Sequence, residues 1–179
     1  MSLHIYDYFT PGFTEFYLTA SMDTGSTPHS LTGVYQTFVA SQTYIPMWVG
    51  AYAQRVYGGN GYMSVAIYDT TTWELMAIGG GDIIYFTLGS YAWTSVQLTP
   101  KNIIRAGRSY GIYFLGTDSG DSWQLAFPKS VEWMDPFTGT VYPGSCNDGV
   151  NWNWSAQPDN DIPFLVWGDE SYQPLSLSR

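Results

Sequence analysis

The strongest constraint on this chain is an alternation of apolar and polar residues with a period of two, in short runs separated by turn-forming residues. Successive side chains of a β-strand point to opposite faces, so such runs predict strands with one buried face. The runs 47–56 and 62–69 alternate in this way, and "YGGNG" separates them. Because Asn-Gly tolerates the positive φ of tight hairpin turns, we expect a hairpin turn there.

Repetition of this pattern along the chain predicts the fold class. About nine or ten runs, spaced ~8–15 residues apart, are typical of an all-β protein, here an antiparallel jelly-roll β-sandwich with minimal helix. The best helical candidate is 99–107, and Gly79-Gly80-Gly81 is expected to divide 73–89 into two short strands. The inward positions of the runs predict these core residues: Phe38, Val65, Ile67, Val96, Ile112, Phe114, Phe164 and Val166.

Composition excludes several classes of function. Aromatic residues make up 18% of the chain and charged residues 12%, so it is rich enough in large apolar side chains to pack a core. The net charge is −9 and only six residues are basic. Nucleic-acid binding needs clustered Lys and Arg, and anionic membrane surfaces attract basic segments, so we expect neither partner.

Cysteine usage and the N-terminal sequence suggest a location. Cys146 is the single cysteine, which prevents an intrachain disulfide, and "MSLHIYDYF" shows no secretory signal pattern. No apolar run approaches ~18 residues. These features predict a protein made in a cytoplasm and later exposed outside, as on a virion surface. The alternative is an extracellular domain whose leader has been removed.

The order of short motifs between Gly33 and Gly168 carries a family resemblance. The chain has an early Gln36-Thr37-Phe38, then "AIYD" at 66–69, "IRAGRSYGI" at 104–112 and a closing "DIPFLVWG" at 161–168. This order resembles carbohydrate-binding-module-like jelly-roll domains of exported polysaccharide-active proteins and of phage tail and head-fibre proteins. The resemblance implies the fold more than the function. Pro163 departs from the pattern and suggests an edge position or a bulge in the last strand.

The domain organisation follows from where the resemblance ends. We expect an N-terminal arm or edge segment at 1–32, a sandwich at 33–168 and a C-terminal tail at 169–179. The arm is rich in aromatics, which would make an unusually large exposed apolar patch unless they pack on the sandwich or on a partner. The residues expected at this interface are Tyr6, Tyr8, Phe9, Phe13, Phe16 and Tyr17.

The segment 147–161, "NDGVNWNWSAQPDND", is the main candidate for a binding site. Trp152 and Trp154 are two residues apart, so in a strand they share one face. One interpretation is a platform on which sugar rings stack, made of Tyr142, Trp152, Trp154 and Trp167. The other, which we favour, is that both tryptophans pack in the core or at an interface.

Carboxylate pairs offer a metal site as a further alternative. Asp118 with Asp121, and Asp159 with Asp161, lie in expected loops, where hard oxygen ligands suit Ca²⁺. Neither pair fits the EF-hand spacing, and Asx-turn hydrogen bonding explains such residues equally well. No cofactor is certain, and structural Ca²⁺ is the one that the sequence leaves open.

Catalysis is not expected. The two histidines, His4 and His29, lie in the weakly patterned N-terminal region, and Cys146 has no basic neighbour that would lower its pKa.

The first functional hypothesis is therefore a non-enzymatic virion structural protein, either a capsid decoration protein or a fibre component. We expect it to bind copies of itself, as a trimer, and other capsid or fibre proteins. The alternative is a carbohydrate-binding module, which a fibre that binds host glycans would combine with the first role. A glycan hydrolase is a third candidate, because carboxylate separation cannot be derived from sequence.

Overall fold

The computed structural model describes residues 3–9, 16–21, 31–55, 62–82, 89–116, 123–128, 141–146, 152–154 and 162–170. These ranges contain twelve strands and no helix, so the prediction of an all-β chain is confirmed for the described residues. The strands are β1 (His4–Phe9), β2 (Phe16–Ser21), β3 (Leu31–Val39), β4 (Ile45–Arg55), β5 (Tyr62–Asp69), β6 (Leu75–Asp82), β7 (Ala92–Pro100), β8 (Ser109–Gly116), β9 (Trp123–Pro128), β10 (Val141–Cys146), β11 (Trp152–Trp154) and β12 (Phe164–Asp169).

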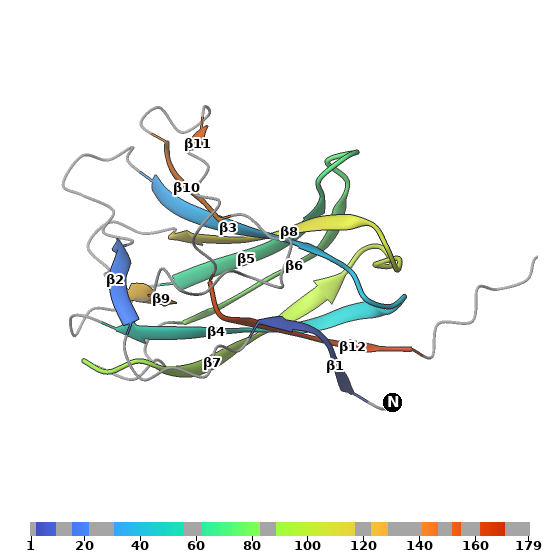
Figure 1. The fold of residues 1–179 in the computed structure, drawn as a ribbon, viewed down its shortest axis with the longest axis horizontal. Coiled ribbons are helices and arrows are strands. Elements are labelled where there is room, and N and C mark those ends of the chain that lie inside the picture. The colour runs from blue at the N-terminus through green and yellow to red at the C-terminus, as the bar shows by residue number, and fades with distance from the viewer. Residues whose placement is uncertain are drawn as a thin grey trace, which may run out of the picture.

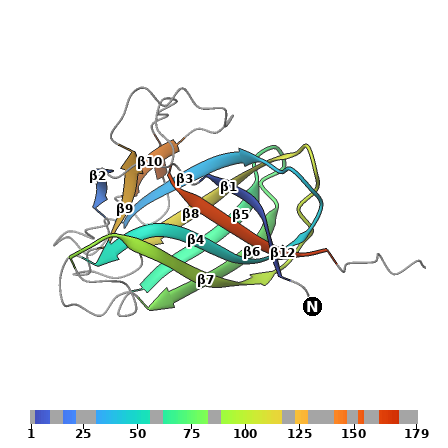
Figure 2. The same ribbon diagram turned by 60° about the horizontal axis from the view of Figure 1, so that its bottom comes forward.

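All neighbouring strands pair antiparallel in one continuous, curled sheet. Its main order is β1-β12-β4-β7-β6-β5-β8-β3-β10-β11, with β9 paired to β4 and β2 paired to β9. Strand β7 makes the curl, because its residues 92–97 pair with β4 and its residues 98–100 pair with β6. The half containing β3, β8, β5 and β6 therefore faces the half containing β12, β4 and β7 (Figure 1). Figure 2 shows β1 lying along β12.

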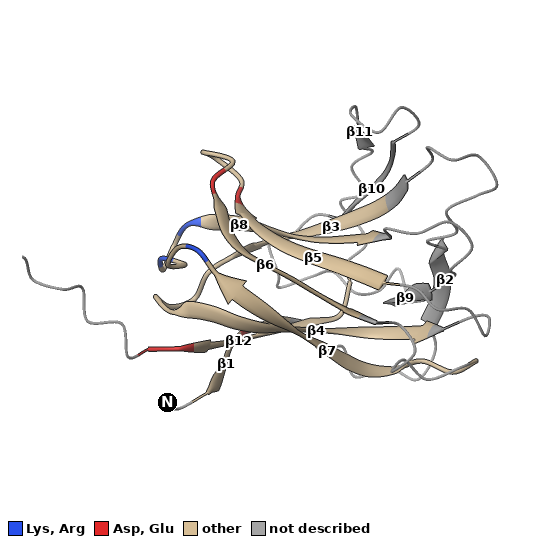
Figure 3. Ribbon diagram, turned by 180° about the vertical axis from the view of Figure 1, so that it is seen from behind, with Lys and Arg blue, Asp and Glu red and all other residues tan. Residues whose placement is uncertain are grey.

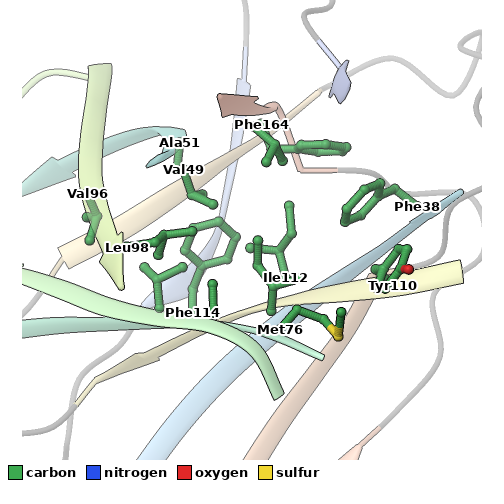
Figure 4. Close-up of a cluster of buried hydrophobic side chains, with 14 of the residues drawn as sticks. Phe38, Val49, Ala51, Met76, Val96, Leu98, Tyr110, Ile112, Phe114 and Phe164 are labelled. Carbon is green, nitrogen blue, oxygen red and sulfur yellow. The ribbon is translucent and has the colours of Figure 1, made fainter. Parts of the chain in front are cut away.

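The hydrophobic core fills the space between the two halves. The Phe38 ring of β3 lies 5.6 Å from the Phe164 ring of β12 and 5.9 Å from the Tyr110 ring of β8. Side chains from both halves point toward one another (Figure 4). All eight core residues that the sequence predicted are at most 3% exposed, which confirms the assignment of strand faces.

Three local predictions are wrong: the break at Gly79-Gly80-Gly81, the helix at 99–107 and the edge position of the last strand. Strand β6 runs unbroken through Gly79, Gly80 and Gly81 instead of dividing there. Gly79 is needed because β6 meets β7 at this point, where a Cβ on Gly79 would overlap the carbonyl oxygen of Gln97. Gly79 therefore marks a close approach of two strands.

The helical candidate at 99–107 is also absent. Strand β7 extends to Pro100, and the N–H groups of Lys101 and Asn102 both donate to the carbonyl oxygen of Met76, at 2.8 and 3.0 Å. Ile104 is fully buried and forms an isolated bridge with Tyr44. Contacts with β6 and with Tyr44 thus take the backbone hydrogen bonds that a helix would have used within itself.

The two ends of the described chain meet at one side of the sheet. Strand β12 begins at Phe164, directly after Pro163, and it lies between β1 and β4, so the expected edge position is wrong. The proline is accommodated because it precedes the strand instead of lying within it. The pairing of β12 with β4 is irregular only between Trp167 and Gly168.

Strand β1 forms the end of the sheet and is tied to the core. Tyr6 is buried and its ring stacks on that of Tyr44 at 4.5 Å. The buried Asp7 accepts a hydrogen bond from the Tyr44 hydroxyl at 2.7 Å and one from the Ser41 N–H at 2.8 Å. Tyr8, in contrast, is 57% exposed. Part of the expected N-terminal arm is therefore built into the fold.

Candidate functional site

The hairpin turn between β5 and β6, residues 69–74, is held by hydrogen bonds at both ends. Asp69 Oδ1 accepts from the N–H groups of Thr71 and Thr72, at 2.9 and 3.0 Å. The Asp69 N–H donates to the carbonyl oxygen of Glu74, and the Trp73 N–H donates to the carbonyl oxygen of Asp69, both at 2.9 Å. An aspartate that caps two following N–H groups fixes a turn in one conformation. The turn is therefore a rigid support for the residues it presents.

Trp73 has an unusual backbone conformation and an unusual exposure. Its φ is 58°, and it is the single non-glycine residue with positive φ in the described ranges. An L-residue in the left-handed region costs about 1–2 kcal/mol, yet the side chain is 62% exposed, so little packing offsets that cost. Strained backbone positions are concentrated at active sites, ligand clamps and switch regions. Trp73 is thus the first candidate for a ligand contact.

Beside Trp73 lies an aromatic hollow of about 370 Å³ on the outer face of β5, β6 and β8. Its lining is mostly apolar and comprises Ser64, Val65, Ala66, Tyr68, Trp73, Ile78, Tyr113 and Leu115. The Tyr113 ring stacks on Tyr35 at 4.5 Å and meets the edge of Tyr68 at 5.3 Å, at 81°. Tyr35 and Tyr113 are buried, so packing holds the Tyr113 ring in place at the floor of the hollow.

A second, basic hollow of about 430 Å³ lies on the other side of the same turn. Its lining comprises Ile45, Asp69, Glu74, Met76, Pro100, Lys101, Asn102, Ile103, Arg105 and Arg108. Figure 3 shows the basic residues of the β7–β8 connection close to the acidic residues of the β5–β6 turn. Arg108 Nη2 lies 2.8 Å from Asp69 Oδ2.

The charge state of Asp69 follows from these contacts. Burial by itself would raise the pKa of Asp69, but the N–H groups of Thr72 and Thr71 and the Arg108 guanidinium together hold this pKa below its ordinary value. Asp69 is thus a structural carboxylate, ionised at neutral pH, that joins the turn to the start of β8. Asp69 lines the basic hollow, and the preceding residue, Tyr68, lines the aromatic hollow.

The aromatic residues predicted from sequence lie in two separate places in the strand order. Tyr142 pairs with Tyr35, and Trp152 and Trp154 pair with Cys146 and Gly144, so these three residues lie on β10 and β11. The structure describes only their backbone. Trp167 lies on β12, near the other end of the order, where its half-buried ring covers Gly50. The prediction that these four side chains form one platform concerns the side chains of Tyr142, Trp152 and Trp154, which lie outside the described part of the structure.

Other predicted site residues are only partly described. Asp118, Asp121, Asp159, Asp161 and Phe13 lie outside the described residues, as does His29, and for Phe9, Phe16 and Tyr17 only the strand backbone is described. His4 is exposed on β1. Within the described ranges no three His, Cys, Asp or Glu side chains come together as a metal site would need. The same ranges contain no helix with the length and apolar character that crossing a bilayer requires.

Sequence reasoning missed Trp73 because it was assigned to the start of a strand. The available signal was "DTTTWE", residues 69–74, an Asp followed by three threonines between two alternating runs. That composition predicts an Asx-type turn, and an aromatic residue at the end of such a turn is not expected to face the core.

Comparison with known proteins adds no assignment: no protein-family model matches the chain, and no curated protein matches it.

Proposed function

We propose that this chain is a non-enzymatic binding module with a jelly-roll β-sandwich fold, which binds carbohydrate at the aromatic hollow. The facing halves of the sheet and the passage of β7 from one half to the other support the jelly-roll assignment. The observation that carries the binding function is Trp73: a solvent-exposed indole, held at φ 58° by a rigid turn, beside a floor of tyrosine rings.

The chemistry of the aromatic hollow favours a sugar ring as its occupant. A pyranose ring has an apolar face of C–H groups and a rim of hydroxyls, so it suits an open aromatic surface with polar groups nearby. Tyr68, Tyr113 and Trp73 supply the aromatic surface, and Ser64 supplies a hydroxyl at its border. The turn adds exposed Thr71 and Thr72 next to the indole.

The test is binding of a polysaccharide panel by affinity electrophoresis, with intrinsic tryptophan fluorescence as a second readout. We expect Trp73→Ala to abolish retardation by the bound polysaccharide. The matched control is Trp93→Ala, which removes another exposed tryptophan, 43% exposed, that lines neither hollow. Equal loss in both variants, or no retardation of the wild type by any polysaccharide, would refute carbohydrate binding at this hollow.

A second candidate function is favoured by strand β1. Leu3, Ile5 and Tyr8 are 46%, 48% and 57% exposed, and β1 is the last strand at its end of the order. An apolar strand at the end of a sheet is a template for pairing with another chain. We propose a second copy of this chain as that partner, within a capsid decoration or fibre protein at a virion surface, as a homotrimer. The module would then present its aromatic hollow to host glycans.

The mass of the purified chain in solution tests this second function. We expect an oligomer for the wild type and a folded monomer for Ile5→Glu, because a charge on the terminal strand opposes edge-to-edge pairing. Val39→Glu is the control, since Val39 is 43% exposed on β3, away from β1 in the strand order. A monomeric wild type would remove the assembly proposal and leave the carbohydrate proposal intact.

A further inference from the structure

The basic hollow concentrates positive charge in an acidic protein. Lys101, Arg105 and Arg108 line it, which is three of the six basic residues of a chain whose net charge is −9. The only acidic residues in the lining are Asp69 and Glu74, so its formal charge is three minus two, or +1. The charge of this lining is therefore opposite in sign to the net charge of the whole chain. An anionic group is the ligand that such a reversal would attract.

The two acidic residues already have partners, whereas two of the cations are available. Asp69 is buried and bonded to Arg108, Thr71 and Thr72, and Glu74 Oε1 accepts from Asn102 Nδ2 at 2.9 Å. Neither Lys101 nor Arg105 forms an ion pair with a carboxylate among the described residues, and both are exposed to solvent.

The segment that carries these cations is anchored at several points. The Lys101 N–H bonds to β6 through the Met76 carbonyl oxygen at 2.8 Å, and the Arg105 N–H donates to the Tyr110 hydroxyl at 2.8 Å. Between them, Ile104 is fully buried. A fixed backbone lowers the entropy that is lost when a ligand orders the two side chains. The hollow is thus preorganised for an anion, although the long side chains stay adjustable.

The β5–β6 turn joins this hollow to the aromatic one. Trp73 lines the aromatic hollow, and the next residue, Glu74, lines the basic hollow. Because the two residues are consecutive, the turn joins the linings of the two hollows, and a ligand that contacts both would be longer than one sugar ring. We infer that the ligand is an acidic carbohydrate whose carboxylate or sulfate groups bind Lys101 and Arg105. This inference rests on the proposed carbohydrate-binding function and specifies its class of ligand.

The experiment compares charged polymers with their neutral counterparts. Polygalacturonate is paired with its fully methyl-esterified form, and dextran sulfate with dextran, and affinity for the full chain is measured by isothermal titration calorimetry. We expect at least one acidic polymer to bind about tenfold more tightly than its neutral partner, because hydrogen bonds between charged groups are the stronger ones. Whichever pair shows this preference identifies carboxylate or sulfate as the recognised group.

Three variants separate the contributions of the hollows. K101Q/R105Q should abolish the preference for the acidic polymer and leave binding of the neutral partner unchanged, whereas Trp73→Ala should weaken both. The control is Arg55→Gln, at the far end of β4 from Ile45, about 30 Å along the strand. Arg55→Gln should retain the preference for the acidic polymer, because removing one distant charge changes only the overall electrostatic potential of the protein.

Two results would overturn the inference. Equal affinity of the wild type for the charged and neutral members of both pairs would show that the basic hollow does not recognise the acidic groups of the ligand. Such a result would leave the carbohydrate-binding proposal itself unaffected. An equal loss of preference in Arg55→Gln and K101Q/R105Q would show that net charge, and not this hollow, sets the affinity. Failure of the proposed function is seen separately, as absence of binding to the whole polysaccharide panel.

Discussion

The inner and outer faces of β5 and β8 are built from the same two strands but differ in how completely their side chains are buried. On the inner face Val65, Ile67, Ile112 and Phe114 are fully buried between the halves of the sheet. On the outer face Tyr113 is buried mainly against other rings, next to half-buried residues such as Tyr68 and Leu115 and the exposed Trp73. Both faces are apolar, yet only the inner one is covered by another part of the described chain.

This difference separates what folding requires from what it does not. A strand with one buried face needs apolar residues only at alternate positions, and the remaining positions are normally polar. Here the outer positions carry tyrosines whose rings contact one another, and the adjoining β5–β6 turn carries a tryptophan held in a strained conformation. The core is complete without these side chains, and the proposed binding function is based on them.

The largest expected effect is on the inner face. Phe114→Ala should lower the free energy of unfolding by about 3–5 kcal/mol, because it removes a fully buried ring and leaves a cavity. The neighbouring outer-face change, Leu115→Ala, should cost about 1 kcal/mol or less, because Leu115 is only half-buried. Urea denaturation measures both. Similar losses for the two variants would mean that the outer face is as fully packed as the inner one.

The next effect tests the close approach of β6 and β7. Gly79→Ala should cost about 2–3 kcal/mol, since its Cβ would overlap the backbone carbonyl of Gln97, which cannot move without breaking β-pairing. Gly81→Ala is the matched control, because its Cβ would lie at an ordinary 3.6 Å from Val96 Cγ2. It should change the free energy of unfolding by less than about 0.5 kcal/mol. Comparable stability of both variants would contradict this strand crossing.

A smaller effect concerns the turn that supports Trp73. Asp69→Ala should cost about 2 kcal/mol, because it removes the acceptor for Thr71 and Thr72 and the partner of Arg108. Arg108→Gln should cost less, about 0.5 kcal/mol, since the Arg108 side chain is 43% exposed and solvent screens the ion pair. Thermal unfolding of both variants provides the comparison.

The same turn should make stability depend on pH. The pKa of Asp69 is lowered in the folded state, so its contribution is present above the ordinary aspartate pKa of about 3.9 and is lost as pH falls through the folded-state pKa. The wild type and Asp69→Ala should therefore differ in unfolding free energy at pH 7 and converge below that range. A difference that is constant from pH 7 to pH 2 would exclude an ionised Asp69 as the cause.

The sequence predicted the inner face well because burial repeats along a strand with a period of two. Alternation alone predicts Phe38, Val96 and Phe114 as core residues, and all are buried. The predictions fail where tertiary contacts decide the local structure. The glycines at 79–81 indicate a break in the sequence pattern, because the strand that Gly79 meets is distant in sequence. The pattern of 99–107 indicates a helix, because its hydrogen-bond partners on Met76 and Tyr44 cannot be derived locally.

The candidate site was harder to predict than the core. Tryptophan pairs such as Trp152 and Trp154 attract attention because they are only two residues apart in sequence, whereas the aromatic hollow is assembled from β5, β6, β8 and the β5–β6 turn. No spacing rule brings Tyr35, Tyr68 and Tyr113 together before the strand order is known. The positive φ of Trp73 is likewise a property of the closed turn and has no signature in residue type.

The smallest expected effect has a distinctive sign and concerns Trp73. Glycine adopts positive φ without steric cost, so Trp73→Gly should raise the free energy of unfolding by about 1 kcal/mol or less, after the entropy lost by glycine is subtracted. The same change at Trp93, within strand β7, should lower the free energy of unfolding, because glycine weakens a strand.

Chemical denaturation of the two variants, combined with polysaccharide binding, distinguishes the roles of the two tryptophans. We expect Trp73→Gly to gain stability and lose binding, and Trp93→Gly to lose stability and retain binding. If Trp73→Gly is instead destabilised, then the indole packs as part of the fold, and the strain at this position has a structural cause.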